Sequence, residues 1–539
     1  MNSRTMDQDH YLFLSIDNMT VNICRREYIG AIVIPNGVTQ ISEYAFAHCT
    51  SITSIEIPNS MTKIGNWAFW ECKSLTSIEI PNSVTIIEDC AFVDCTSLTS
   101  IKIPDGVTII EDSVFKGCSS LTSIKIPDSV TIIEDCAFED CSSLSSIEIP
   151  NSVTRIGGST FKGCSSLTSI EIPDSVTIIE DCAFEDCSSL TSIKIPDGVT
   201  IIGGSAFKGC SSLTSIKIPD GVTIIGGSAF KGCSSLTSIK IPMNVTKIKY
   251  ATFDSCTSLT TIFIPDSVTE IERLAFLKCT SLTSINIPKG VSKLGEGAFT
   301  CCSKLSTIVI PDGVTEIGAL FYGCTSLTSV IIPRTVTEIL AGVFSCCTAL
   351  KEFIVDVQNS KYSSMDGILY SKDMHLLFAV PIGKKKIEIP DSVMWIGEKA
   401  FCGCTNLTSI KIPDGVRKIK MFAFRDCTSL TTITIPKSVY LIEAGAFENC
   451  TSLTSIESPD HANPNIGFRA FRGCGKLERN DLINESEDDC YERLEYYNYD
   501  NERTFDRYNG YYAQDVEGWS DQDIDDVLDG DPDAYWNID

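Results

Sequence analysis

The chain has 539 residues, and its 70 acidic residues outnumber its 43 basic residues, which gives a formal net charge of −27 at pH 7. A phosphate backbone or an anionic lipid surface would repel such a chain, so nucleic-acid binding and binding to a membrane surface are not expected. The apolar runs are the length of strands and fall short of the ~18 residues that a membrane-spanning helix needs, so no membrane insertion is expected either.

Residues 1–28 precede the repeats described below and are predicted to form an amino-terminal cap. This segment has a single early arginine, Arg4, an interrupted apolar stretch and no small-residue cleavage pattern. A secretory signal instead has a positively charged start, an uninterrupted apolar stretch and a small-residue cleavage site. We therefore expect a cytoplasmic protein, with an extracellular or cell-surface location as the alternative.

A repeat of 23 residues dominates the chain. A proline recurs at this interval from Pro35 to Pro311, and the interval resumes between Pro390 and Pro459. The segment 187–209, CSSLTSIKIPDGVTIIGGSAFKG, recurs without change at 210–232. Self-similarity at a fixed period of this length is typical of solenoids, in which each coil buries its apolar residues against its neighbours. The sequence therefore predicts one repeat solenoid over 29–355, continued over 387–478.

Each coil offers one set of apolar positions, which in the coil after Pro104 are Val107, Ile110, Val114, Phe115, Cys118, Leu121, Ile124 and Ile126. The pattern LxxIxI before each proline predicts a short strand, and such strands would stack as a parallel sheet. The pair DG or DS after proline predicts a turn, and VTII predicts a short second strand. The following EDxxFxxC predicts a single helical turn. With about 4.8 Å between stacked strands, about nineteen coils would form a curved rod on the order of 90 Å long.

The repeat is interrupted over 356–386. The letters YSSMDGILYSKDMHLLFAV form two strand-like runs around a turn, and the basic run Lys384, Lys385 and Lys386 follows them. This pattern predicts a β-hairpin inserted into one coil.

Residues 479–539 form an acidic tail. From Asp481 onward 20 acidic residues face only three arginines, and apolar residues are sparse. A segment of this composition cannot bury enough surface to offset chain entropy, so disorder is expected. The aromatic residues among the acids, as in CYERLEYYNYD, could form a short recognition segment for a basic partner.

The repeated letters CxxLTSIxIPxxVTxIGxxAFxxC identify the family that the chain resembles. Over about 35–477 they resemble the BspA-like, or Treponema pallidum type, leucine-rich repeats, and the DGILYSKD hairpin followed by PxGK is similar to that family as well. The resemblance implies a leucine-rich-repeat horseshoe or gently curved solenoid that binds proteins, in bacterial relatives often at the cell surface.

Eighteen cysteines occupy the same position in successive coils, for example Cys72, Cys95 and Cys118. The favoured interpretation is a ladder of buried thiols, each giving a weak hydrogen bond to a neighbouring carbonyl. Disulfides between stacked copies are the alternative, although parallel Cβ directions oppose the torsion that the bond needs. Zinc binding is not indicated, because no CxxC pair exists and Cys402-x-Cys404 lacks partners.

No pattern in the sequence predicts catalysis. The four histidines, His10, His48, His375 and His461, are scattered, and the common hydrolase, zinc-protease and nucleotide-binding motifs are absent. We therefore expect neither an enzyme nor a cofactor.

The outward position of the first strand lies between its two isoleucines, and it is the position at which the coils differ most. It is charged in the first half of the chain and becomes apolar near the centre. The candidate partner-binding residues in this column are Phe263, Asn286, Val309, Ile331 and Ile354, bordered by Lys194, Lys217 and Lys240. An exposed apolar row beside charges is typical of a protein-binding surface, although drift of older coils, or burial of the row under the hairpin, would also account for it.

The leading hypothesis is a non-enzymatic scaffold that binds a protein or peptide on its strand face. The alternative is a secreted or cell-surface adhesin or receptor-like repeat protein with oxidised cysteines, to which the glycosylation sequons, for example at Asn244, lend slight support. The partner's identity and the oligomeric state do not follow from the sequence.

Overall fold

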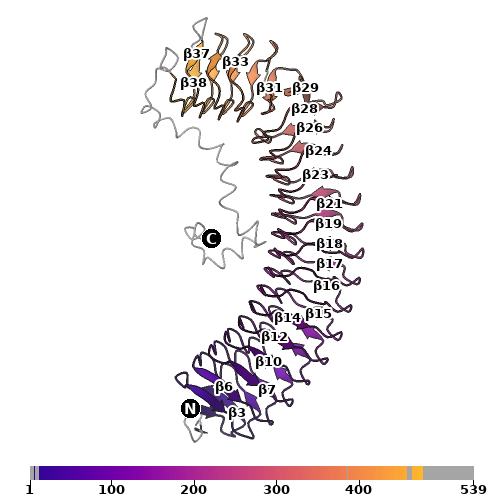
Figure 1. The fold of residues 1–539 in the computed structure, drawn as a ribbon, viewed down its shortest axis with the longest axis vertical. Coiled ribbons are helices and arrows are strands. Elements are labelled where there is room, and N and C mark those ends of the chain that lie inside the picture. The colour runs from indigo at the N-terminus through magenta and orange to yellow at the C-terminus, as the bar shows by residue number, and fades with distance from the viewer. Residues whose placement is uncertain (1–4, 7–10, 385–386, 458–463, 478–539) are drawn as a thin grey trace. The chain divides into compact units, whose positions relative to one another are not determined.

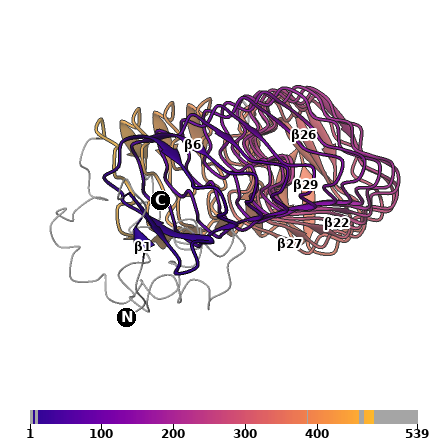
Figure 2. The same cartoon turned by 90° about the horizontal axis from the view of Figure 1, so that it is seen from below.

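The computed structural model describes residues 5–6, 11–384, 387–457 and 464–477. The chain divides into two units, Met1–Leu477 and Glu478–Asp539. In the first unit the coils follow one another in chain order (Figure 1), and seen from below they overlie one another (Figure 2). The predicted repeat solenoid with a parallel β-sheet face is therefore confirmed. The acidic tail predicted over 479–539 lies outside the described residues.

Most coils contribute two short strands, one on each of two faces. The first strands are β4 (Gly30–Val33), β6 (Ile52–Glu56), β8 (Ser77–Glu79), β10 (Ser100–Lys102), β12 (Ser123–Lys125), β14 (Ser146–Glu148), β19 (Ser238–Lys240), β21 (Thr261–Phe263), β24 (Thr307–Val309), β26 (Ser329–Ile332), β28 (Glu352–Val355), β33 (Ser409–Lys411), β35 (Thr432–Thr434) and β37 (Ser455–Glu457). The second strands are β5 (Gln40–Ile41), β7 (Lys63–Ile64), β9 (Ile86–Ile87), β11 (Ile109–Ile110), β13 (Ile132–Ile133), β15 (Arg155–Ile156), β16 (Ile178–Ile179), β17 (Ile201–Ile202), β18 (Ile224–Ile225), β20 (Lys247–Ile248), β22 (Glu270–Ile271), β23 (Lys293–Leu294), β25 (Glu316–Ile317), β27 (Glu338–Ile339), β32 (Trp395–Ile396), β34 (Lys418–Ile419), β36 (Leu441–Ile442) and β38 (Asn465–Ile466).

Strand pairing places each residue over its copy one coil away. Ile101 of β10 pairs with Ile124 of β12, and Ile110 of β11 pairs with Ile133 of β13, all in parallel. The predicted turn after proline is also present, since the amide of Val107 donates to the carbonyl oxygen of Pro104 at 3.1 Å. Register is strongly specified here, because a slip of one residue would turn every buried isoleucine toward water.

Phenylalanine and cysteine form two ladders through the core. The rings of Phe161 and Phe207 stack on opposite sides of Phe184 with centroids 5.5 Å from it, and all three rings are buried. Most ladder thiols donate to the phenylalanine carbonyl oxygen one coil back, as Cys118 does to Phe92 at 3.2 Å. The predicted hydrogen-bonded ladder of buried thiols is therefore confirmed.

The predicted helical turn in EDxxFxxC is wrong, since the described residues contain no helix. Two positions of this segment adopt positive φ. In one coil they are Ser113, at 55°, and Gly117, at 72°. The amide of Ser113 donates to Asp135 and that of Gly117 to Glu139, both in the next coil. Left-handed residues at this spacing break a helix and instead turn the amides toward the neighbouring coil.

The segment 1–28, predicted as a cap, contains β1 (Thr5–Met6), β2 (Leu12–Leu14) and β3 (Thr20–Cys24). These strands pair antiparallel in order, and β3 then pairs parallel with β5 of the first coil. The chain therefore enters the solenoid along the sheet of second strands.

The insertion predicted over 356–386 contains β29 (Tyr362–Met365), β30 (Ile368–Ser371) and β31 (Leu376–Ala379), joined as an antiparallel meander. It is part of the stack, because β31 pairs parallel with β32 of the next coil. Residues Lys385 and Lys386 of the predicted basic run lie outside the described residues. In the described part of the chain no helix is long and apolar enough to cross a membrane.

The aromatic ladder should carry a large share of the stability. Replacing Phe184 with alanine should lower the free energy of unfolding by about 3–5 kcal/mol, because it opens a cavity between two stacked rings. The matched change Phe263→Ala should cost less than about 1 kcal/mol, since Phe263 keeps 49% of its surface exposed. Urea denaturation measures both, and equal losses would contradict the placement of either ring.

Candidate interaction surface

The candidate surface lies on the sheet of first strands. In each first strand an outward residue stands between two inward ones, as Lys102 stands exposed between buried Ile101 and Ile103. This alternation follows from the two-residue period of a strand. Only the outward column can differ between coils without disturbing the stacked core.

All eight predicted residues lie in this one column. Phe263 pairs with Lys240, Ile331 pairs with Val309, and Ile354 pairs with Ile331, each as direct neighbours in parallel strands. The remaining predicted residues continue the same column. Isolated bridges join Lys194 to Lys217, Ser215 to Ser238 and Ser284 to Thr307, which places Lys217 beside Lys240 and the exposed Asn286 between Phe263 and Val309.

The apolar members of the row face solvent. Phe263 is 49% exposed, Val309 60%, Ile331 39% and Ile354 44%. The inserted hairpin does not bury them, because it meets the sheet edgewise: the amide of Phe353 donates to the carbonyl oxygen of Gly367 at 2.9 Å. The expectation that the row might be buried under the hairpin is therefore wrong.

Sequence reasoning missed one exposed apolar side chain beside this row. The amide of Val355 donates to Ser364 Oγ at 3.2 Å, so the end of β29 follows the outer edge of β28. Met365, the last residue of β29, is 41% exposed there. The fold of the hairpin against β28 is not encoded in the 23-residue period, which is why the repeat pattern could not reveal it.

Three lysines follow one another in the outward column, next to the apolar row. Among the described residues Lys194 and Lys217 form no ion pair, and Lys240 Nζ reaches only Asp220 Oδ1, at 3.7 Å, with both side chains largely exposed. Like charges on directly opposed positions destabilise a sheet. The column therefore holds three neighbouring positive charges, two of which have no ion-pair partner among the described residues.

No group of three or more His, Cys, Asp and Glu side chains that could hold a metal ion occurs within the part of the chain that the structure describes. What the column offers is apolar area next to positive charge.

The family model for the BspA type leucine rich repeat region matches residues 21–145, 131–260, 250–365 and 378–494. The chain belongs to this family of leucine-rich repeat proteins. Comparison with curated proteins finds no match.

Solved structures of repeat proteins are similar to the chain. A leucine-rich repeat protein from Bacteroides ovatus is 30% identical, with a TM-score of 0.53, over 66% of this chain and 98% of that one. A leucine rich cell surface protein from Faecalibacterium prausnitzii is 27% identical, with a TM-score of 0.39, over 66% and 95%. A Treponema pallidum leucine-rich repeat protein is 24% identical, with a TM-score of 0.26, over 43% and 87%.

Repulsion among Lys194, Lys217 and Lys240 should lower the free energy of unfolding. Replacing Lys217 with glutamate should raise the free energy of unfolding by about 0.5–1 kcal/mol, because it converts two like-charge contacts into opposite-charge contacts. The gain should shrink in about 1 M salt.

The same charge reversal at Lys208 serves as the control. Lys208 Nζ lies 2.9 Å from Glu185 Oε1, so Lys208→Glu should destabilise the chain. Denaturant melts of both variants at low and high salt measure the effect, and a loss of stability in Lys217→Glu would contradict the assigned repulsion.

Proposed function

We propose that the chain is a non-enzymatic scaffold that binds a protein or peptide on its strand face. The observation that carries the proposal is the exposed apolar row, Phe263, Val309, Ile331 and Ile354, on a column that elsewhere is mostly charged. Exposed apolar side chains gathered along one column of a repeat protein favour a docking surface.

The row also favours a particular kind of partner. From Phe263 to Ile354 the column spans four coil steps, which is about 19 Å, or an extended segment of about six residues. Lys194, Lys217 and Lys240 continue the same column on the side of Phe263. A partner segment with apolar residues at one end and acidic residues at the other would match both halves, and acidic residues there would also relieve the repulsion among the lysines.

We also propose that the protein works with reduced thiols, as in a cytoplasm. The support is that the ladder thiols from Cys72 to Cys347 all serve as hydrogen-bond donors to phenylalanine carbonyls, a role that a disulfide sulfur cannot take. Burial raises the pKa of the Cys118 thiol to about 12, so this donor stays protonated at neutral pH.

Capture experiments test the binding face. Changing Phe263, Val309 and Ile331 to serine should abolish capture of the partner from a lysate of the source organism with little loss of stability, because the three side chains are partly exposed. The matched control changes Glu270, Lys293 and Glu316 to serine on β22, β23 and β25, and should capture normally. Unchanged capture by the first variant would end the proposal.

Thiol titration of the unfolded chain tests the redox state. Protein purified under conditions that block exchange should give close to its 26 cysteines as free thiols. In the native state Cys346, the exposed cysteine among those described, should react first, and the ladder thiols should wait for unfolding. A count near zero in the unfolded chain would favour the secreted alternative.

A further inference from the structure

A second outward column changes its chemistry in the last coils. Just before the second strand, most coils carry a threonine whose amide donates to the threonine one coil back, as Thr131 does to Thr108 at 2.8 Å. The last coils replace it with Met394, Arg417 and Tyr440.

The backbone ladder itself is unbroken in these coils. The amide of Arg417 donates to Met394 at 2.8 Å, that of Tyr440 to Arg417 at 3.0 Å, and that of Met394 to His375 of the insertion at 2.8 Å. The replacements therefore alter the surface and leave the stacking as it is.

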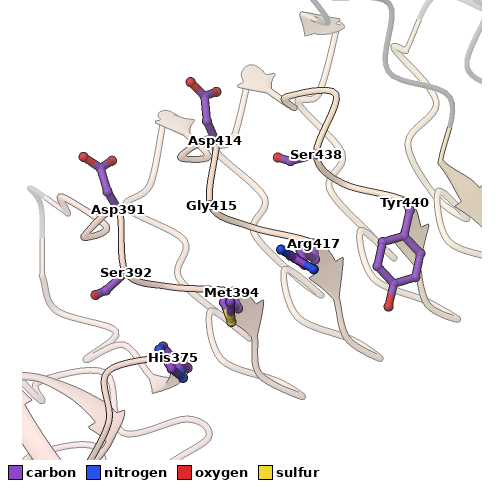
Figure 3. Close-up of a pocket in the computed structure, with 9 residues that line it drawn as sticks. All are labelled: His375, Asp391, Ser392, Met394, Asp414, Gly415, Arg417, Ser438 and Tyr440. Carbon is purple, nitrogen blue, oxygen red and sulfur yellow. The ribbon is translucent and has the colours of Figure 1, made fainter.

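The long side chains form one wall of a groove. Its volume is about 530 Å³, within the usual range for sites that hold small ligands. Figure 3 shows His375, Met394, Arg417 and Tyr440 along one edge and Asp391 and Asp414, from two successive turns, along the other. Threonine is too short to build such a wall, which explains why the groove occurs in these coils.

The two edges of this groove carry opposite charges that do not pair with each other (Figure 3). Arg417, Asp391 and Asp414 are all exposed, and none of them has an ion-pair partner among the residues that the structure describes. The two aspartates would repel an anion, and the arginine would repel a cation. A ligand that carries both charges satisfies both edges.

The floor of the groove holds a second unsatisfied group. In several coils the serine of the turn donates to a valine carbonyl one coil back, for example Ser129 Oγ to Val107 at 2.6 Å and Ser267 Oγ to Val245 at 2.7 Å. Ser438 lines the groove, and its Oγ is buried with no hydrogen-bond partner in the described part of the chain. A buried hydroxyl without a partner is costly, and a ligand with a polar backbone would pair with it once the Ser438 side chain rotates toward the groove.

We propose that the groove binds a short zwitterionic peptide with free ends. Its carboxylate pairs with the Arg417 guanidinium, and its ammonium lies at the edge formed by Asp391 and Asp414. An apolar side chain packs on the ring of Tyr440, which is 53% exposed. Arg417 and Asp414 belong to one coil and Asp391 to the coil before it, so the two charged ends lie close together along the stack, which suits a short peptide. This site lies on a different strand face from the row that contains Phe263 and does not depend on it.

Isothermal titration calorimetry of the full chain with the tripeptide Ala-Phe-Ala tests the proposal. The free peptide should bind, and acetylation of its amino end or amidation of its carboxyl end should each weaken binding about tenfold or more. These blocked peptides probe the unaltered protein, so the result does not depend on any variant folding. No heat from the free peptide at millimolar concentration, or equal binding of all three forms, would overturn the proposal.

Two variants test which end of the peptide lies at which edge of the groove. Arg417→Thr restores the residue typical of the column, so it should fold normally and bind the free and amidated peptides equally weakly. Asp414→Asn should likewise reduce the preference for a free amino end. The control Lys411→Thr lies on β33 of the same coil, on the other face, and should bind as the unaltered chain does. Full affinity in Arg417→Thr would also overturn the proposal.

The strand-face variant with serine at 263, 309 and 331 separates this site from the proposed function. It should bind the tripeptide normally even though it fails to capture the partner. Loss of tripeptide binding in that variant would contradict the assignment to the groove.

Discussion

The structure depends on vertical register between identical coils. Buried side chains lie over their own copies, so that Phe161, Phe184 and Phe207 stack ring on ring and most ladder thiols donate to a carbonyl oxygen one coil back. A single coil has too few apolar contacts to be stable alone, and burial becomes sufficient only when neighbours repeat the same residues at the same height. This requirement explains why the chain holds a period of 23 residues and why two of its coils are identical letter for letter.

The same requirement separates the residues that stacking determines from those that remain free to vary. Inward positions such as Ile101 and Leu121 are buried and repeat, whereas the outward position between Ile101 and Ile103 carries lysine, glutamate, phenylalanine or valine in different coils. Both binding sites proposed for this chain lie on outward columns, and the backbone hydrogen bonds behind the groove continue unchanged from His375 to Tyr440. A solenoid can therefore acquire a binding surface by substitution alone, at little cost to the stacked core.

Much of this architecture follows from the sequence, and what does not follow has physical causes. Alternation around Ile124 and Ile126 predicted the first strands and the outward direction of Lys125 between them, because the two-residue period leaves no other choice. The helical turn expected in the turn segment is wrong because the residue type gives no sign that serines such as Ser113 adopt a positive φ. The groove was missed because one of its walls begins at His375, which reaches the column through the paired strands of the insertion.

The insertion explains where the two surfaces lie along the chain. Its tip hydrogen-bonds to β28, so the sheet that carries the apolar row ends at Ile354 against the hairpin. Its last strand, β31, instead pairs with β32 and passes the second-strand sheet on to the coils that hold the groove. One segment thus interrupts the first sheet and continues the second. A column of outward residues ends where the sheet that carries it ends, and it continues where a further strand pairs in register. For this reason the apolar row stops where the insertion begins, and the column of long side chains starts where the insertion ends.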